Sequence, residues 1–442
     1  MHEASQETTD RYESLDFLTD GTIIRDPYPY YQFLHERRGP VWIEPVHGMA
    51  MVTGYEEALT VYRDHETFSS CNAPSGPFSG FPASPEVDDV SALVEQHRAD
   101  MPLHGYMATW DPPEHTAYRS LLTGLFTPRR LAATEAFMGQ LAERQIDEFL
   151  ERGACELIYQ FAVPYTMLVI ATLLGVPQED LPRFRAWFDA QQARNTAGQG
   201  RVQVEDLNVL SSFEDAFTSY LEDRRRRPRE DVLTHLAQVT FPDGSTPTTT
   251  VLANEAAFLF AAGQETTART LAFAVQYLAE HPRTQEFLRE HRDRVPGFVE
   301  EILRLESPVQ DHFRLARKAT TLGGVSIPAG TTVMMMIGAV NRDPRRFDAP
   351  DEFSLDRRNS YEHVTFARGV HTCLGQPLAR AEARIGLEHI LDRMADIRIS
   401  TVEHGPAGAR RYDYDPTSLF RGLKALHVEF TAADRRAGVA RP

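Results

Sequence analysis

Cysteine is scarce in this sequence, with only Cys71, Cys155 and Cys373 among 442 residues. They lie far apart and are odd in number, so no disulfide framework is indicated and a reducing compartment is expected. No apolar run reaches the length of about 18 residues that a transmembrane helix needs. The segment Met1–Asp20 is polar and acidic, so we expect neither a signal peptide nor a membrane anchor.

Positive charge is also in deficit, because 46 Lys and Arg stand against 63 Asp and Glu, giving a formal net charge of -17. Nucleic acids and anionic membranes repel a strongly acidic chain, so neither is an expected partner. A hydrophobic share of 42% and a charged share of 25% are typical of a globular protein. We therefore expect a cytoplasmic protein, kept dispersed by its charge, that functions as a monomer.

No internal repeat or low-complexity linker divides the chain, so one folding unit is expected. The spacing of apolar residues predicts a mainly α protein with small β-sheets. We expect a single domain over residues 26–430, a polar extension over 1–25 and a tail over 431–442. From 68 to 108 the pattern breaks into Gly- and Pro-rich turns, and a loop of this length is often a functional lid.

The predicted helices are numerous and include one unusually long member. They cover residues 30–36, 55–65, 114–126, 128–152, 161–174, 181–197, 205–224, 230–239, 250–280, 283–291, 297–305 and 374–394. Short strands are expected over 41–43 and 50–52, with a final β pair over 397–400 and 425–430. Two apolar runs around Pro328-Ala329-Gly330 predict a β-hairpin over 324–336.

The segment FARGVHTCLG, residues 366–375, is the strongest candidate for a chemical site. It places Cys373 just before a long predicted helix, and Pro377 fits the first turn of that helix. A helix N-terminus offers unpaired N–H groups and a partial positive charge, which stabilise an anionic sulfur. An inert buried cysteine is the alternative for any lone Cys. Cys71 and Cys155 lack this context, and no role is predicted for them.

This segment resembles the heme-binding loop of the cytochrome P450 family, whose pattern is Phe-x-x-Gly-x-x-x-Cys-x-Gly. The resemblance extends over roughly 26–430 and implies that family's fold, with a long central helix over a buried heme b. It makes Cys373 the axial ligand of the heme iron. Around the cofactor it places Phe366, Gly369, His371 and Gly375, with the two glycines allowing close approach of the backbone. Ala367 departs from the Gly of many members and is expected to be tolerated.

The sequence Glu301-Ile302-Leu303-Arg304 resembles the family's Glu-x-x-Arg helix, which braces the heme loop. Residues three apart share a helix face, so Glu301 and Arg304 can both point inward. A third partner in the family is often an Arg that precedes the Cys loop. Glu352 stands at that position here, and Arg357 is the candidate replacement.

The sequence Ala262-Gly263-Gln264-Glu265-Thr266-Thr267 resembles the family's oxygen-binding stretch and lies in the helix predicted over 250–280. The resemblance implies that the small residues Ala262 and Gly263 leave room for dioxygen. Thr266 would hydrogen-bond the dioxygen, and Glu265 would relay protons as a positioned acid. An ordinary helix, whose Thr bonds back to a helix carbonyl, is the alternative.

Four basic side chains stand at the family's positions for binding the two heme carboxylates. His115 and Arg119 are four residues apart and share a helix face, whereas Arg314 and His371 come from separate segments. Arg is well suited to bidentate pairing with a carboxylate. The resemblance therefore predicts propionate binding by this set, although each residue alone is typical of an ordinary surface cation.

The resemblance implies a soluble, bacterial-type monooxygenase that inserts one atom of dioxygen into a small organic substrate. Electrons are expected from a separate ferredoxin and an NAD(P)H-dependent ferredoxin reductase. The candidate basic residues for ferredoxin docking are Arg119, Arg129, Arg130, Arg368, Arg380 and Arg384. Two alternatives stay open: a heme-thiolate enzyme that uses peroxide or does not oxygenate, and a heme protein that binds a ligand without catalysis.

The sequence does not identify the substrate, but it suggests an apolar pocket. By resemblance the lining residues are Phe258, Val309, Phe313, Leu419 and Phe420. Membership of the ordinary core is an equally good interpretation of each of them. Asp311 and His312 are unusual polar residues in such a stretch, and they would either recognise a polar group of the substrate or face solvent.

Overall fold

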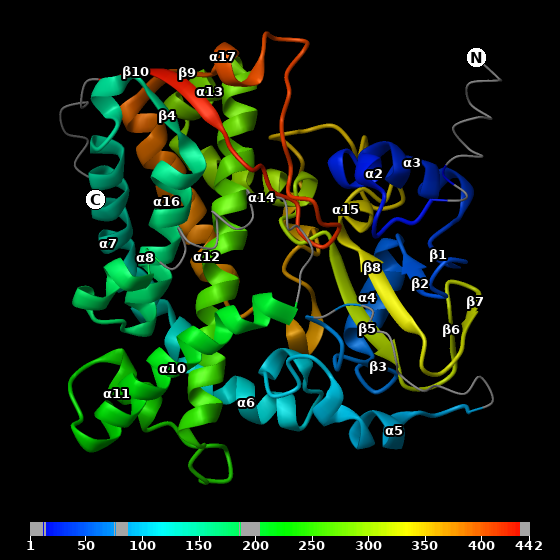
Figure 1. Cartoon of the computed structure of the whole chain (residues 1–442). Helices are drawn as coiled ribbons and strands as arrows, with labels where there is room; N and C mark the ends of the chain where they lie inside the picture. The colour runs from blue at the N-terminus through cyan, green and yellow to red at the C-terminus, as the bar shows by residue number, and fades with distance from the viewer. Residues whose placement is uncertain are drawn as a thin grey trace.

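In the computed structural model, most of the helices lie on one side of the molecule, where the long helix α12 (Thr249–Glu280) runs, and the largest sheet lies on the other side (Figure 1). The structure describes residues 12, 15–74, 76, 87–184, 186 and 204–433. The mainly α architecture with small sheets is the one that the sequence predicts. Within the described residues, no helix is long and apolar enough to cross a membrane.

The predicted helices within the described residues are found near their expected bounds. Those before residue 200 are α2 (Gly21–Arg25), α3 (Tyr28–Arg37), α4 (Tyr55–Arg63), α5 (Ser91–Gln96), α6 (Glu114–Thr123), α7 (Pro128–Asp147) and α8 (Val163–Leu174). Those after it are α10 (Val204–Arg226), α11 (Val232–Ala237), α12 (Thr249–Glu280), α13 (Pro282–Glu290), α14 (Val295–Leu305), α15 (Ile337–Val340), α16 (Gln376–Arg393) and α17 (Thr401–His404). Helices α2, α5, α15 and α17 are additional to the predicted ones, and the predicted helix 181–197 lies largely outside the described residues.

The strands form sheets of five, three and two strands. The five-stranded sheet has the order β1 (Val41–Ile43), β2 (Ala50–Val52), β8 (Thr332–Met336), β5 (Asp311–Ala316) and β3 (Phe68–Ser69). The three-stranded sheet has the order β4 (Ala154–Glu156), β10 (His427–Ala432) and β9 (Met394–Ile399). The pairing of β9 with β10 confirms the predicted final β pair.

The predicted hairpin over 324–336 is wrong. Strand β7 (Val325–Ile327) pairs with β6 (Thr320–Leu322), whereas β8 pairs with β5 and, in parallel, with β2. The Pro-Ala-Gly turn therefore connects two different sheets. Strand β8 is buried at four of its five positions, and this apolar surface is covered by long-range neighbours that no local turn signal can identify.

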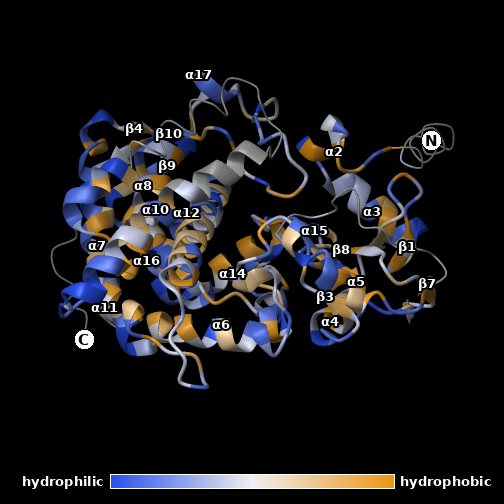
Figure 2. Cartoon of the chain, turned by 60° about the horizontal axis from the view of Figure 1, so that its bottom comes forward, coloured by the Kyte–Doolittle hydropathy of each residue, from blue (hydrophilic) through white to orange (hydrophobic). Residues whose placement is uncertain are grey.

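Helix α12 is the centre of the largest hydrophobic cluster (Figure 2). Its first turn is capped by Thr248, whose hydroxyl accepts a hydrogen bond from the N–H of Val251 at 3.2 Å. Apolar residues follow almost all round the helix, and it contacts α8, α10, α14 and α16. Ala262 is nevertheless exposed in the middle of this packed helix. One face of α12 therefore opens onto a hollow within the fold.

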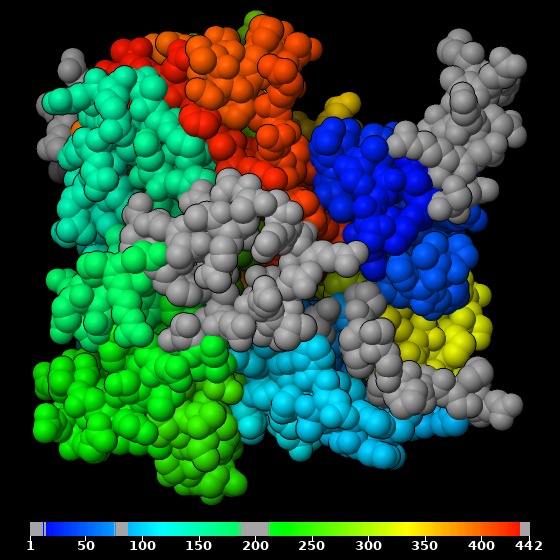
Figure 3. Space-filling view, viewed as in Figure 1, coloured from blue at the N-terminus to red at the C-terminus, as the bar shows by residue number. Residues whose placement is uncertain are grey.

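Segments from the two ends of the chain lie side by side (Figure 3). The guanidinium of Arg421 donates to the carbonyl of Arg25 at 3.1 Å and lies 4.9 Å from the ring centre of Tyr28. Phe17 and Ile23, inside the segment expected to be a polar extension, are buried. Strand β10 ends at Ala432. The division into extension, domain and tail stays a prediction.

Candidate functional site

Cys373 lies in the loop that leads into α16, three residues before the helix begins. The loop is held by a hydrogen bond from the N–H of Cys373 to the carbonyl of Phe366 at 2.8 Å. Cys373 is an exposed free cysteine, whereas Cys71 and Cys155 are free and buried. Burial among protein atoms raises the pKa of the Cys373 thiol, and the N–H of Gly375 and the charge of Arg119 partly offset this rise. The Cys373 thiol has accessible surface although protein atoms surround it, so it faces a hollow inside the fold, as Ala262 does.

Gly369 and Gly375 of this loop differ in what a side chain at each position would contact. A Cβ on Gly369 would lie 2.4 Å from the carbonyl oxygen of Tyr62 on α4, and its φ is +71°. Gly369 is therefore required by packing against protein, which the sequence interpretation did not foresee. A Cβ on Gly375 would meet only the sulfur of Cys373, at 3.9 Å. Ala367 holds a φ of 55°, a left-handed conformation that explains the preference for Gly at this position.

The four predicted propionate ligands come together from separate elements. The rings of His115 on α6 and His371 are 4.0 Å apart between centroids. Burial, together with the charges of Arg119 and Arg314, lowers the pKa of His115 to about 4. The same causes lower the pKa of His371. Arg119 donates to the carbonyl of Thr372 at 2.8 Å, and Arg314 to that of Phe313 at 2.6 Å.

This basic cluster fits a ligand with two carboxylates. Within the described residues, none of its four members is recorded in an ion pair with an acid, and the buried ring nitrogens His115 Nδ1 and Nε2 and His371 Nε2 have no hydrogen-bonding partner. Asp111, the nearby acid, is paired with Arg317 at 2.9 Å. Buried cations normally have anionic partners. Beside a cysteine thiol, this donor set matches the chemistry of a heme.

The predicted oxygen-binding residues lie on the open face of α12. Ala262 and Glu265 are exposed, and Thr266 is half-buried. The Thr266 hydroxyl donates back to the Ala262 carbonyl at 3.0 Å, so the back-bonded geometry of the alternative is present. The Glu265 carboxylate pairs with Arg269, which also binds Asp415 at 2.9 Å.

Gly263 faces α8 instead of the hollow. A Cβ added there would lie 3.2 Å from the side chain of Ile170. The Thr166 hydroxyl, on the same helix α8, donates to the Gln264 carbonyl at 2.7 Å. The small side chain of Gly263 thus serves close packing of two helices, a role that the oxygen-binding resemblance does not include.

The predicted brace is present with Arg357 as its third member. Glu301 and Arg304 on α14 are fully buried and form two hydrogen bonds of 2.9 Å each. Arg357 donates to Glu301 Oε1, also at 2.9 Å. Arg304 further donates to the backbone carbonyls of Asn341, Pro350 and Glu352. The network therefore ties α14 to the segment that precedes the Cys373 loop.

A second ionic cluster near the loop was missed by the sequence analysis. Glu300, adjacent to the brace residue Glu301, accepts from Arg380 on α16 at 2.6 Å and lies 3.2 Å from His363 Nε2. Burial alone would raise the pKa of Glu300, but His363 and Arg380 lower it to about 2. The Arg380 guanidinium also lies 4.7 Å from the ring centre of Phe366. No recognisable spacing links these residues in the sequence.

Several expected docking cations already have partners. Arg380 is paired with Glu300, and Arg384 with Glu135 and Glu388. The Arg368 guanidinium donates to the carbonyls of residues 361, 362 and 363. These contacts reduce the number of basic side chains available to an acidic partner near the loop.

The five predicted pocket residues fall into two groups. Val309 and Phe420 meet in an isolated β-bridge, and the Arg269 guanidinium lies 5.0 Å from the Phe420 ring centre. Phe258 on α12 is half-buried against Tyr106, at 5.5 Å between ring centres. Phe313 is buried in the core cluster beside the sheet, and Leu419 packs against that cluster. The core interpretation therefore fits these last two.

The polar pair on β5 is covered by protein. Asp311 is buried, with no hydrogen-bonding partner for either carboxylate oxygen within the described residues, and burial raises its pKa well above the usual value. His312 Nδ1 lies 2.5 Å from the Tyr62 hydroxyl, and burial lowers its pKa to about 3. The expectation that these residues face solvent is wrong for Asp311.

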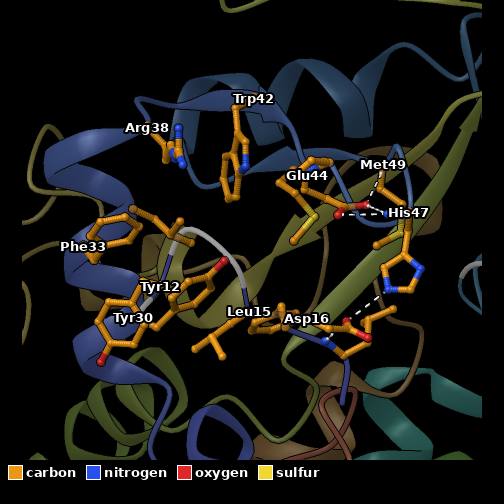
Figure 4. A pocket seen from close by; sticks show the side chains of 15 residues that line it. Tyr12, Leu15, Asp16, Tyr30, Phe33, Arg38, Trp42, Glu44, His47 and Met49 are labelled. Carbon is orange, nitrogen blue, oxygen red and sulfur yellow. Dashed lines mark hydrogen bonds and ion pairs between the residues drawn. The ribbon is translucent and has the colours of Figure 1, made fainter. Parts of the chain in front are cut away.

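A separate small hollow lies at the N-terminal side (Figure 4). It is lined by residues between Tyr12 and Met51, among them Trp42 and Arg38, and an ion pair of 3.0 Å joins His47 to Asp16 at its rim. None of the predicted site residues lines it. Its volume of about 30 Å³ suits a water molecule better than an organic substrate.

Comparison with known proteins points to one family. A family model described as Cytochrome P450 matches residues 206–395. Cytochrome P450 109 from Bacillus spizizenii is 31% identical over 92% of this chain and 92% of its own length. The cytochrome P450 monooxygenase PikC from Streptomyces venezuelae is 30% identical over 99% of this chain and 100% of its own length. The solved structure of Mycobacterium marinum cytochrome P450 CYP150A6 in the substrate-free form has a TM-score of 0.89 and 51% identity, covering 96% of this chain and 100% of that one.

Proposed function

Because this chain belongs to the cytochrome P450 family of monooxygenases, we propose that it binds heme b through Cys373 and oxygenates a largely apolar organic substrate. The observation that carries the proposal is the cluster of His115, Arg119, Arg314 and His371, which has no acidic partner in the described part of the chain and lies beside the Cys373 loop. A heme bound there would supply the reductive activation of dioxygen.

The basic cluster would hold the two heme carboxylates. Arg314 and Arg119 present charged donors, and the buried His115 and His371 are neutral near pH 7 and offer one N–H each. The brace of Glu301, Arg304 and Arg357 would keep the Cys373 loop in position from the opposite side. Phe366 and Gly375 would contact the cofactor.

The exposed face of α12 would control protons and oxygen. Thr266 still has acceptor capacity while it donates to Ala262, and a rotation of its hydroxyl would let it donate to bound dioxygen. Glu265 is exposed and salt-bridged to Arg269, so it could exchange protons with solvent. Val309, Phe420 and Phe258 would form the apolar boundary of the substrate space.

We also propose a ferredoxin and an NAD(P)H-dependent reductase as electron donors, and a monomer in the cytoplasm. Dioxygen and a small organic molecule complete the set of partners. Arg129 and Arg130 at the start of α7 are the docking candidates whose guanidinium groups have no hydrogen-bonding or ionic partner among the described residues. A positively charged face near the thiolate would attract an acidic ferredoxin.

The absorption spectrum of the reduced, carbon-monoxide-bound protein tests the proposal. Thiolate ligation is expected to give a strongly red-shifted Soret band, and Cys373→Ser should abolish it. Cys155→Ser is the matched control, because Cys155 is buried in β4 far along the chain from the site. A band that survives in Cys373→Ser, or a protein that binds no heme on reconstitution, would contradict the assignment.

Turnover experiments separate the remaining alternatives. A ferredoxin-dependent monooxygenase should need ferredoxin, reductase and NAD(P)H. The Thr266→Ala variant should still oxidise NAD(P)H but form little product. Product formation with peroxide alone would favour the peroxide-using alternative. A protein that binds ligands but never turns over with any donor would be a non-catalytic heme protein.

A further inference from the structure

A buried acid on α12, Glu255, is outside the family motifs. Its side chain is fully buried, and its Oε1 accepts a hydrogen bond from the N–H of Met107 at 2.6 Å. Its Oε2 is also buried and has no partner within the described part of the chain. An unpaired buried carboxyl oxygen costs free energy of folding. A ligand that pairs with Oε2 would account for this arrangement.

Glu255 lies on the open face of α12. Half-buried and exposed residues in the middle of this helix include Asn254, Phe258, Ala261, Ala262, Glu265 and Thr266, whereas the half-buried Gly263 faces α8. Their spacing of three or four residues forms one stripe along the helix. Glu255 falls within this stripe, seven residues before Ala262, a spacing of about two turns or about 10 Å.

The loop of residues 101–110 covers Glu255. Besides the bond from Met107, the Tyr106 hydroxyl in this loop binds Glu214 on α10, and the Tyr106 ring packs against Phe258. The Thr109 hydroxyl donates only to carbonyls of the loop itself, and the Thr109 carbonyl accepts from Arg98, which is not on α10 or α12. Few polar contacts therefore attach this part of the loop to the helices behind it, so a ligand could displace it and reach Oε2.

We propose that Glu255 is a specificity-determining residue, which binds a keto or ether oxygen of the substrate about 10 Å from the carbon that is oxidised. This inference rests on the proposed function, which places the reaction next to Ala262 and Thr266. Oε1 already accepts the Met107 N–H, so the proton of the neutral carboxyl is on Oε2. Oε2 then donates to a substrate oxygen that has no proton of its own.

The protonation of Glu255 gives this recognition a pH dependence. Burial raises the pKa of Glu255 to about 8, and the Met107 N–H partly offsets the rise. Two tyrosines face it, Tyr106 from the loop and Tyr118 from α6, and burial raises the pKa of both. Glu214 acts on the site through the Tyr106 hydroxyl. Affinity for a keto oxygen should therefore fall as the pH rises through about 8, because the carboxylate loses its donor.

Binding to the heme-loaded protein tests the inference, with the spin-state change of the heme as the readout. The probes are straight-chain methyl ketones and the alkanes of equal length. Wild type should bind the best ketone about tenfold more tightly than its alkane at pH 7, the contribution of about one hydrogen bond. Glu255→Leu should lose this preference and keep its alkane affinity. Glu255→Gln should keep most of the preference without the pH dependence, since an amide also donates.

The controls separate this inference from the proposed function. Glu222→Gln, on the exposed side of α10, should leave both affinities unchanged. A ketone preference that is absent from wild type or that survives in Glu255→Leu overturns the inference, and so does a wild-type preference that stays the same as the pH rises through about 8. In each case the red-shifted carbon monoxide spectrum would remain. Loss of that spectrum in wild type would instead contradict the proposed function.

Discussion

Gly369 and Ala367 both hold left-handed backbone in the loop before Cys373, and at Gly369 a close neighbour adds a second constraint. A Cβ at Gly369 would meet the Tyr62 carbonyl oxygen, an atom of the α4 backbone that cannot move aside easily. The family pattern identifies the glycine, but the sequence does not reveal that α4 is the reason for it. Single positions of the motif could thus be predicted without their physical cause.

Replacing this glycine should loosen the site. Gly369→Ala is expected to destabilise the protein by about 2 kcal/mol, from backbone strain and the contact with Tyr62. It should also speed the transfer of heme to apomyoglobin, because α4 and the Cys373 loop must separate. Gly297→Ala on α14 is the control, since nothing lies within 4 Å of its added Cβ. Equal stability of the two variants in urea would contradict this explanation.

Glu255 shows why part of the site could not be predicted. A Glu in a helix is usually solvated, and Glu255 is covered by segments distant in the sequence, among them the loop of residues 101–110. Cys373, Glu301 and Arg304 were predictable because their spacing is short and specific. Arg357 was predictable as a candidate, and its 2.9 Å contact with Glu301 gives the brace its third member.

At the scale of elements, local pattern predicts helices well and strand partners poorly. Helix α12 was expected over 250–280 and is observed over Thr249–Glu280, because apolar periodicity and a Thr cap are both local signals. Strand β8 was recognised as a strand, but its partners β2 and β5 are distant along the chain. Pairing depends on which buried faces meet in the fold, and a turn such as 328–330 carries no information about that.

The brace between α14 and the segment before the Cys loop gives a prediction at this scale. Arg357→Ala removes one partner from the fully buried Glu301 and should cost about 2 to 4 kcal/mol of stability. The control Arg294→Ala breaks the pair of Arg294 with the exposed Asp356 and should cost less than about 1 kcal/mol. Chemical denaturation measures both values. Similar losses in the two variants would show that the brace is no stronger than a surface pair.

At the scale of the whole molecule, buried contacts link the side that holds most of the helices to the side that holds the five-stranded sheet. The Arg304 network joins α14 to the backbone of Asn341, and Ser307 after α14 bonds both Asn341 and Thr365. The Glu300 cluster connects α14 with α16. The Arg304 and Ser307 contacts cross between the two sides close to the Cys373 loop, where a misplacement of either side would disturb the site.

Unfolding should therefore be a single cooperative event for the heme-loaded protein. Differential scanning calorimetry is expected to show one transition whose calorimetric and van't Hoff enthalpies agree. Absorbance of the heme and far-ultraviolet circular dichroism should change at the same temperature. Two separate transitions would contradict the prediction of a single domain over residues 26–430.

Arg421 connects the two chain ends at the edge of the expected substrate space. It follows Phe420 directly, donates to the carbonyl of Arg25 and packs its guanidinium between the rings of Tyr28 and Tyr414. The bridge between Phe420 and Val309 is thus next to a contact that α2 and α3 hold in place. A chimera that takes only residues 414–423 from a relative would lack the matching contacts with α2 and α3. An exchange of this segment that is meant to change substrate specificity should therefore include α2 and α3.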